Sequence, residues 1–145
     1  MSVGRLCVRN VDVADPDESA KTVAARMHAR NVGTLVVLDK TKRPIGIVTD
    51  RDLATRVVAQ AKAATDTTAE EVMTAIQKTV SEEIPIEEAI AIMRSGPFRR
   101  MPVVNGEGRL VGLLSIDDVL DLLADEFRQI GELLKRESPG SLAHS

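Results

Sequence analysis

The chain has 145 residues, of which 28% are charged and 43% are hydrophobic, and its formal net charge is -3. This size and balance suit one compact domain or two half-domains that share a core, and the acidic charge argues against a general nucleic-acid binder, which needs a basic face. Because no apolar run approaches the roughly 18 residues that span a bilayer, and the N-terminus lacks the apolar core of a signal peptide, we expect a cytoplasmic protein without membrane contacts.

In chain order, the first half predicts a strand, a helix, two strands and a second helix. The first helix follows from an apolar stripe at positions i, i+3, i+4 and i+7, which is formed by Ala20, Val23, Ala24 and Met27. The strands are expected at residues 11–14, 34–38 and 45–48, with a turn at 39–42. The second helix is expected from Thr49 to about Ala63, and residues 64–67 link it to the second half.

The second half repeats this order after a short helix to Met73, which a capping box of Thr68 and Glu71 opens. Its long helix has the same stripe, formed by Ile86, Ala89, Ile90 and Met93. Pro85 suits the first turn of that helix, where a missing N–H costs nothing. The strands are expected at residues 77–80, 100–104 and 111–114, and Asn-Gly at 105–106 is a strong hairpin signal.

The final helix differs from its counterpart in the first half because its apolar stripe is longer. The stripe consists of Ile116, Val119, Leu120, Leu123, Phe127, Ile130 and Leu134. Gly131 weakens the helix late, and Ser138-Pro139-Gly140 ends it. The stripe either packs back on its own domain or meets another subunit in part, and we expect the second, because a body of this size offers little surface to cover it.

The two halves are copies of one unit. A shift of 66 residues lays Met27 on Met93 and Asp52 on Asp118 without a gap. A duplicated unit predicts a pseudo-twofold body with clefts between its halves. We therefore predict an α+β fold made of two β-α-β-β-α units, at residues 6–63 and 68–126, with residues 127–145 as a C-terminal helical extension and tail.

Few residues here can support catalysis or bind a metal. Cys7 is the only cysteine, so an intrachain disulfide is excluded. With His28 and His144 as the only histidines, a Cys/His zinc site and most nucleophile–base pairs are excluded too. There is no Trp or Tyr, so a bound flat ring must lie between aliphatic side chains. We expect no catalytic residue and no metal site.

Two hydroxyl–acid pairs, Thr49 with Asp52 and Ser115 with Asp118, lie at the ends of equivalent glycine-containing strands. One interpretation is helix capping, which a hydroxyl followed three residues later by an acid provides. The other is ribose binding, because a carboxylate beside a hydroxyl can hold a cis-diol. The reciprocal cap prefers the longer Glu or Gln, so Asp at both sites favours a ligand, and one pair can do both.

The cations that could bind phosphate are shared unequally between the copies. Arg51 lies beside the first pair, whereas Asp117 occupies that position in the second copy. Arg99 and Arg100 lie at the entry of a strand of the second copy, where the first has Gly33 and Thr34. Each arginine is either solvated surface, the usual fate of the residue, or a phosphate ligand.

The stretches Gly46-Ile47-Val48-Thr49-Asp50-Arg51-Asp52-Leu53 and Arg99-Arg100-Met101-Pro102-Val103-Val104 resemble the signatures of tandem cystathionine-β-synthase (CBS) domain pairs, also called Bateman modules. The resemblance runs from about Leu6 to Leu123. It implies that the hydroxyl and Asp of each pair hold the ribose of an adenosine nucleotide. It also implies an adenine cleft lined by Val13, Ala14, Ile45, Val80 and Val111.

The resemblance implies a regulatory module that senses AMP, ADP or ATP, with no obligatory cofactor and no attached enzyme. It also implies a homodimer through the helices that follow Thr49 and Ser115, and it leaves an unidentified protein target open. The alternative is a constitutive dimerisation or docking module without a physiological nucleotide. The sequence does not choose among AMP, ATP, NAD and S-adenosylmethionine, which share adenosine, although Asp117 disfavours a polyphosphate at the second pair.

Overall fold

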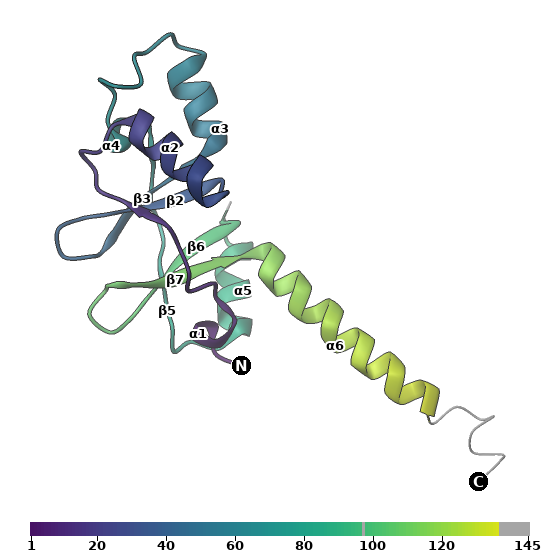
Figure 1. Cartoon of the computed structure of the whole chain (residues 1–145). Helices are drawn as coiled ribbons and strands as arrows, with labels where there is room; N and C mark the ends of the chain where they lie inside the picture. Colours follow the sequence, from purple (N-terminus) through teal and green to yellow (C-terminus); the bar gives the residue numbers. More distant parts are fainter. Residues whose placement is uncertain (97, 137–145) are drawn as a thin grey trace. The chain divides into compact units, whose positions relative to one another are not determined.

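A computed structural model describes residues 1–96 and 98–136 of the chain (Figure 1). The chain comprises two compact units, Met1–Leu114 and Ser115–Ser145. Two small sheets with helices make up a mixed α and β fold, which confirms the expected class. No helix among the described residues has the length and apolar character that crossing a membrane requires. The expected helix stop at residues 138–140 lies outside the described residues.

The first sheet has the strand order β1-β2-β3-β4, with bounds Val13–Ala14, Thr34–Leu38, Pro44–Thr49 and Thr74–Ala75. Strand β1 is parallel to β2, and the other neighbours are antiparallel. Helix α2 (Ala20–Arg30) begins at Ser19, whose hydroxyl accepts the N–H of Thr22. It buries three of its four expected apolar residues in the core, and Ala24 alone is exposed.

The second sheet has the order β5-β6-β7, with bounds Val80–Ser81, Arg100–Val104 and Leu110–Ser115. Helix α5 (Ile86–Arg94) buries Ile86, Ala89 and Met93. Pro85 precedes this helix as its N-cap residue, with extended backbone, so its expected place in the first turn is wrong by one residue. In the second unit, helix α6 covers Ile116–Arg136.

The strands that enter each repeat are shorter than expected. Residues 11–14 and 77–80 were predicted, but only Val13–Ala14 and Val80–Ser81 form strands. Strand β1 pairs with Val36 and Val37 of β2. Strand β5 pairs with Val103 and Val104 of β6.

The helix after Thr49 also stops earlier than the expected Ala63. It consists of α3 (Asp50–Leu53) and a π-helical turn, η1 (Ala54–Val58). Ala61 then takes the left-handed conformation, with φ of 53°. The N–H of Lys62 donates to the Val57 carbonyl at 3.0 Å, and that of Ala61 donates to Val58 at 3.1 Å. These bonds form a Schellman-type end, which usually carries glycine.

Both hairpins of the first unit turn in the same way. Asp39 Oδ1 accepts the N–H groups of Thr41 and Arg43 at 2.8 and 3.0 Å, and Asn105 Oδ1 accepts those of Glu107 and Arg109 at 3.0 and 3.1 Å. The fourth turn residue is left-handed in both: Lys42 (φ 68°) and Gly108 (φ 78°). The Asn-Gly hairpin is thus confirmed, but Gly108, not Gly106, supplies the positive φ. Hydrogen bonds from the Thr41 hydroxyl and the Arg43 N–H lower the pKa of Asp39.

The first short helix of each repeat is hydrogen-bonded to the other repeat. Helix α4 (Ala69–Val72) has the expected capping box of Thr68 and Glu71. Its counterpart α1 (Val3–Leu6), 66 residues earlier, was not among the expected elements. The N–H groups of Val3 and Gly4 donate to carbonyls of residues 84 and 82, both at 2.9 Å. Those of residues 69 and 70 donate to carbonyls of residues 18 and 16, at 2.8 and 3.0 Å.

This exchange of segments between the repeats also includes strand pairing, because residues after each short helix pair with a strand of the other repeat's sheet. Thr74 in β4 pairs with Ile47 of the first sheet, and Val8, its counterpart, forms a bridge with Leu113 of the second. The central glycines make room for these segments. A Cβ at Gly112 would lie 2.6 Å from the Val8 carbonyl oxygen, and one at Gly46 would overlap the Met73 side chain. The repeated glycine therefore admits the segment exchanged from the other repeat.

We predict that Gly112→Ala lowers the free energy of unfolding by about 1–3 kcal/mol, because the methyl group would press on backbone that cannot move aside cheaply. Gly106→Ala is the matched control, since a Cβ there meets nothing within 4 Å. Urea unfolding followed by circular dichroism measures both variants. Equal midpoints for the two would show that close approach does not explain Gly112.

Candidate functional site

Thr49 and Asp52 form a closed capping box at the end of β3. The N–H of Asp52 donates to Thr49 Oγ1 at 3.2 Å, and the N–H of Thr49 donates to Asp52 Oδ2 at 2.9 Å. The capping interpretation is therefore confirmed for this pair. The reciprocal cap was expected to prefer the longer Glu or Gln, but the Asp52 carboxylate also reaches the N-cap amide, so Asp at this position does not by itself favour a ligand.

Ser115 and Asp118 repeat this geometry in the second unit. The N–H of Asp118 donates to Ser115 Oγ at 3.2 Å, and the N–H of Ser115 donates to Asp118 Oδ2 at 3.0 Å. In each pair one carboxylate oxygen is used for the cap and the other is not. The hydroxyl accepts one bond and keeps its own hydrogen for donation.

The remaining oxygen of Asp52 has a cationic neighbour, Arg56, that sequence reasoning missed. Arg56 Nη2 lies 3.7 Å from Asp52 Oδ1, and the side chains are 41% and 15% exposed, respectively. Arg56 Nη1 donates to the Val72 carbonyl at 2.7 Å, at the end of α4. The available signal was the i, i+4 spacing of an acid and a base on a helix. The second copy has Leu122 at this position, so the equivalent i, i+4 ion pair is not possible there.

The expected phosphate ligands are exposed and lie at several places. Arg51 follows Asp50, whose Oδ1 accepts the Arg51 N–H at 2.8 Å. Asp50 also covers Gly33, because a Cβ there would lie 3.0 Å from Asp50 Oδ2. The second copy has Arg99 in place of Gly33, followed by Arg100 at the start of β6. The charge at this position therefore differs between the copies.

The expected adenine-lining residues fall into separate groups. Ala14 and Val80 are buried, Ala14 as part of the core cluster around α2. Ile45 lies at the start of β3, about 13 Å from Thr49 at roughly 3.3 Å per residue. Of the five, Val13 and Val111 line a cavity that the structure shows among the described residues. The hydroxyl–acid pairs do not line that cavity.

The end of β1 is held by Arg26 and Glu18, neither of which was predicted to matter. Arg26 Nη1 donates to the Val13 carbonyl and Nη2 to Glu18 Oε2, both at 2.7 Å. Burial raises the pKa of Glu18, but hydrogen bonds from Arg26 and the Asp15 N–H outweigh it, so the pKa lies below its usual value. The Val13 carbonyl is therefore already engaged and is a poor acceptor for a base edge.

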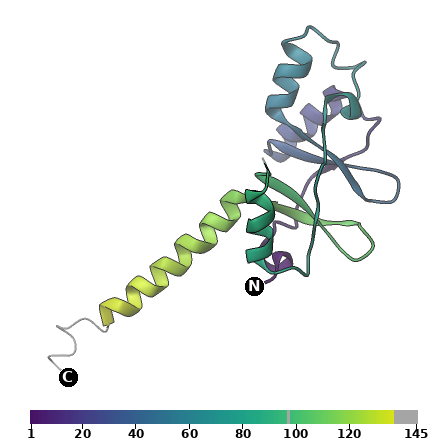
Figure 2. The same ribbon diagram turned by 180° about the vertical axis from the view of Figure 1, so that it is seen from behind.

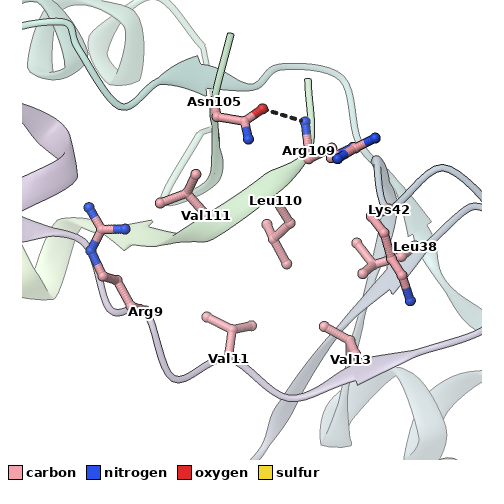
Figure 3. Close-up of a pocket in the computed structure, with 9 residues that line it drawn as sticks. All are labelled: Arg9, Val11, Val13, Leu38, Lys42, Asn105, Arg109, Leu110 and Val111. Carbon is pink, nitrogen blue, oxygen red and sulfur yellow. Dashed lines mark hydrogen bonds between the residues drawn. The ribbon is translucent and has the colours of Figure 1, made fainter. Parts of the chain in front are cut away.

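The cavity of about 400 Å³ lies at the hairpin end of the first unit, opposite the end of β3 that holds Thr49 (Figure 3). It has aliphatic walls and three cationic side chains. The lining residues are Arg9, Val11, Val13, Leu38, Lys42, Asn105, Arg109, Leu110 and Val111. Among the described residues there is no group of three His, Cys, Asp or Glu side chains that could hold a metal ion.

Comparison with known proteins agrees with this repeat. The CBS domain family matches residues 3–59 and 66–125. The uncharacterized protein MK0525 of Methanopyrus kandleri is 34% identical over 122 residues, which span 84% of this chain and 62% of that protein. An inosine-5'-monophosphate dehydrogenase of Methanocaldococcus jannaschii is 29% identical over 115 residues, which span 78% of this chain but only 22% of the enzyme.

A solved structure gives the likeness in three dimensions. The CBS domain protein PAE2072 from Pyrobaculum aerophilum, complexed with AMP, superposes with a TM-score of 0.70 and 30% sequence identity. The match covers 81% of this chain and 89% of that one. Two family matches, two repeats with the same strand order and two equivalent capping boxes agree: the chain belongs to the CBS domain family, as a tandem CBS pair.

Proposed function

We propose that this CBS pair is a regulatory module that binds an adenosine nucleotide such as AMP, ADP or ATP. The observation that carries the proposal is the pair Thr49 and Asp52, in which the cap uses one carboxylate oxygen and leaves the other for a ligand. The relative from Pyrobaculum aerophilum, which was solved with AMP, supports this choice of ligand class.

The ribose would bind where β3 meets α3. The Asp52 carboxylate can accept hydrogen bonds from both hydroxyls of a cis-diol, and the Thr49 hydroxyl can donate one. Bonds to a charged carboxylate are about twice as strong as neutral ones. Arg51, next to Asp52 in sequence and exposed, is the proposed ligand of the phosphate.

A signal from this site would pass through Arg56. This side chain lies near Asp52 Oδ1 with one nitrogen and holds the end of α4 with another. A ligand that occupies the carboxylate would alter the charge that Arg56 faces, and so its hold on the segment shared between the repeats. The ligand shifts the module only to the extent that its affinity for two arrangements differs.

We propose no catalytic role for the chain. The inosine-5'-monophosphate dehydrogenase that it resembles is matched over only 22% of its length, so that activity is not carried over. The proposed location is the cytoplasm, where adenosine nucleotides are available.

A constitutive dimerisation or docking module is the second candidate, and helix α6 favours it. In the second unit, Phe127 and Leu134 are 71% and 63% exposed. The apolar positions alternate four and three residues apart, as in a two-stranded coiled coil; they are Ile116, Leu120, Leu123, Phe127, Ile130 and Leu134. Both functions fit one molecule, in which α6 joins two copies and the nucleotide regulates them.

Asp52→Asn and Asp118→Asn are expected to weaken AMP binding at the affected site by about 1.5–3 kcal/mol, because the amide keeps the size but loses the charge. Asp50→Asn is the matched control, since Asp50 lies outside the pair. Isothermal titration calorimetry gives the affinity and thermal unfolding gives the stability. Wild-type AMP affinity with a melting temperature lowered by several degrees would identify the two residues as caps only.

The chain is expected to be a homodimer, joined through α3–η1 and α6 and reinforced by residues 127–134. Sedimentation velocity at micromolar concentration should give twice the 15.7 kDa of one chain. The double variant Phe127→Lys, Ile130→Lys should dissociate it because it places charges in the apolar seam. Asp121→Lys, on another face of α6, should not. A wild-type monomer would contradict the dimer.

The two hydroxyl–acid pairs are expected to differ in affinity, with one tight nucleotide per chain at Thr49 and Asp52. Arg51→Ala should weaken that site by up to about 1 kcal/mol, the usual range for an exposed ion pair. Asp117→Arg should strengthen the second site, because it replaces a repelling acid with a cation. Two sites of equal affinity in calorimetry, both insensitive to Arg51→Ala, would overturn this expectation.

A further inference from the structure

We propose that the hairpin-end cavity of the first unit binds a small organic phosphate, with an apolar body inside and the phosphate at its cationic end. This site is separate from the proposed ribose site, because Thr49 lies at the far end of β3 and does not line the cavity. The proposal does not depend on the nucleotide function.

The walls suit an apolar body. Five of the nine lining residues are aliphatic, namely Val11, Val13, Leu38, Leu110 and Val111. Figure 3 shows aliphatic side chains on facing sides of the space, with Val11 just before β1, Val13 in β1, and Leu110 and Val111 on β7. A volume of about 400 Å³ lies within the usual range of small-molecule sites.

The charges suit a phosphate. Three lining residues are cationic, and none of the nine carries a carboxylate. Lys42 and Arg109 lie at one end of the cavity and Arg9 at the other (Figure 3). Two positive charges at one end match a phosphate dianion better than a singly charged carboxylate.

The backbone brings these like charges together. The N–H of Leu110 donates to the Lys42 carbonyl at 3.0 Å, which joins the two hairpins. Both hairpin loops project from the same side of the first unit in Figures 1 and 2. A Cβ at Gly108 would lie 3.3 Å from Arg43 Nε, so a further cation is close. Crowded cations repel one another in the unbound protein, and a bound anion would relieve this repulsion.

The neighbouring acids leave this positive end largely uncompensated. Glu107 lies 3.2 Å from Arg109, but both side chains are exposed, where an ion pair contributes little. Asp39 uses its carboxylate within its own turn. Arg9 donates to the Gly4 carbonyl at 2.8 Å and lies 3.9 Å from Glu82, so it is held in place at the other end. Asn105 uses its oxygen in the turn and keeps its amide hydrogens as donors.

The repeat itself offers a comparison. At the positions equivalent to Arg9, Lys42, Val11 and Val13, the other copy has Ala75, Gly108, Gln77 and Thr79. The equivalent surface therefore lacks two of the three cations and two of the aliphatic walls. This combination of cations and aliphatic walls is therefore not repeated at the equivalent positions, as expected of a dedicated site.

Methyl-detected NMR titration of the full chain tests the proposal, with phenyl phosphate, inorganic phosphate and phenol as probes. We expect phenyl phosphate to shift the methyl resonances of Val11, Val13 and Val111 and to bind more tightly than either partial probe. Lys42→Gln and Arg109→Gln should each weaken it about fivefold, the effect of one exposed charge contact. Lys40→Gln is the matched control from the same turn, because Lys40 does not line the cavity, and it should change the affinity less than twofold.

Three results would overturn the proposal: unshifted cavity methyls, inorganic phosphate that binds as tightly as phenyl phosphate, or equal effects of the lining and control variants. Asp52→Asn separates this site from the ribose site. It should leave phenyl phosphate affinity unchanged whether or not it weakens AMP binding. A loss of phenyl phosphate binding in Asp52→Asn would place the probe at the ribose site and refute a separate cavity site.

Discussion

The rest of the first unit depends on the exchange of short segments between the repeats. Helix α1 and Val8 form backbone hydrogen bonds with the second repeat, and α4 and β4 form backbone hydrogen bonds with the first. Gly46 and Gly112 allow these segments to approach because they have no side chain to obstruct them. Neither sheet of the first unit is complete without a segment from the other repeat, and the cavity near the two hairpins is lined by residues of both repeats.

In the proposed function, stability and ligand binding would depend on the same side chains at the strand ends. Thr49 and Asp52 form the capping box that starts α3, and they are also the proposed ligands of a ribose. Arg56 connects this pair to α4, which belongs to the exchanged segment. A ligand at Asp52 would therefore act on a contact that also holds the repeats together. This coupling is available to the first pair alone, because Leu122 replaces Arg56 in the second copy.

Sequence reasoning succeeded where the signal is local. The runs at Thr34–Leu38 and Arg100–Val104 are strands with the predicted bounds, and Thr68 with Glu71 makes the predicted cap. It failed where tertiary contacts decide. Helix α1 is one turn long and has no periodicity, and its place depends on carbonyls about 80 residues away in the chain. The left-handed residue that ends the helix is Ala61, and without a glycine there the sequence does not indicate this end. The cationic cavity is lined by residues of two hairpins that lie far apart in the sequence and are joined by a hydrogen bond between Leu110 and Lys42.

The exchange also sets an order for folding during synthesis. The first sheet has all its strands once β4 has emerged from the ribosome, so it can close while the second repeat is still being made. Val8, by contrast, has to wait for Leu113, near the end of the second sheet. Contacts between such distant residues form slowly, because a long loop must close first. A strand edge without its partner during that interval is open to wrong pairing with other chains, so this segment is where chaperone binding would matter most.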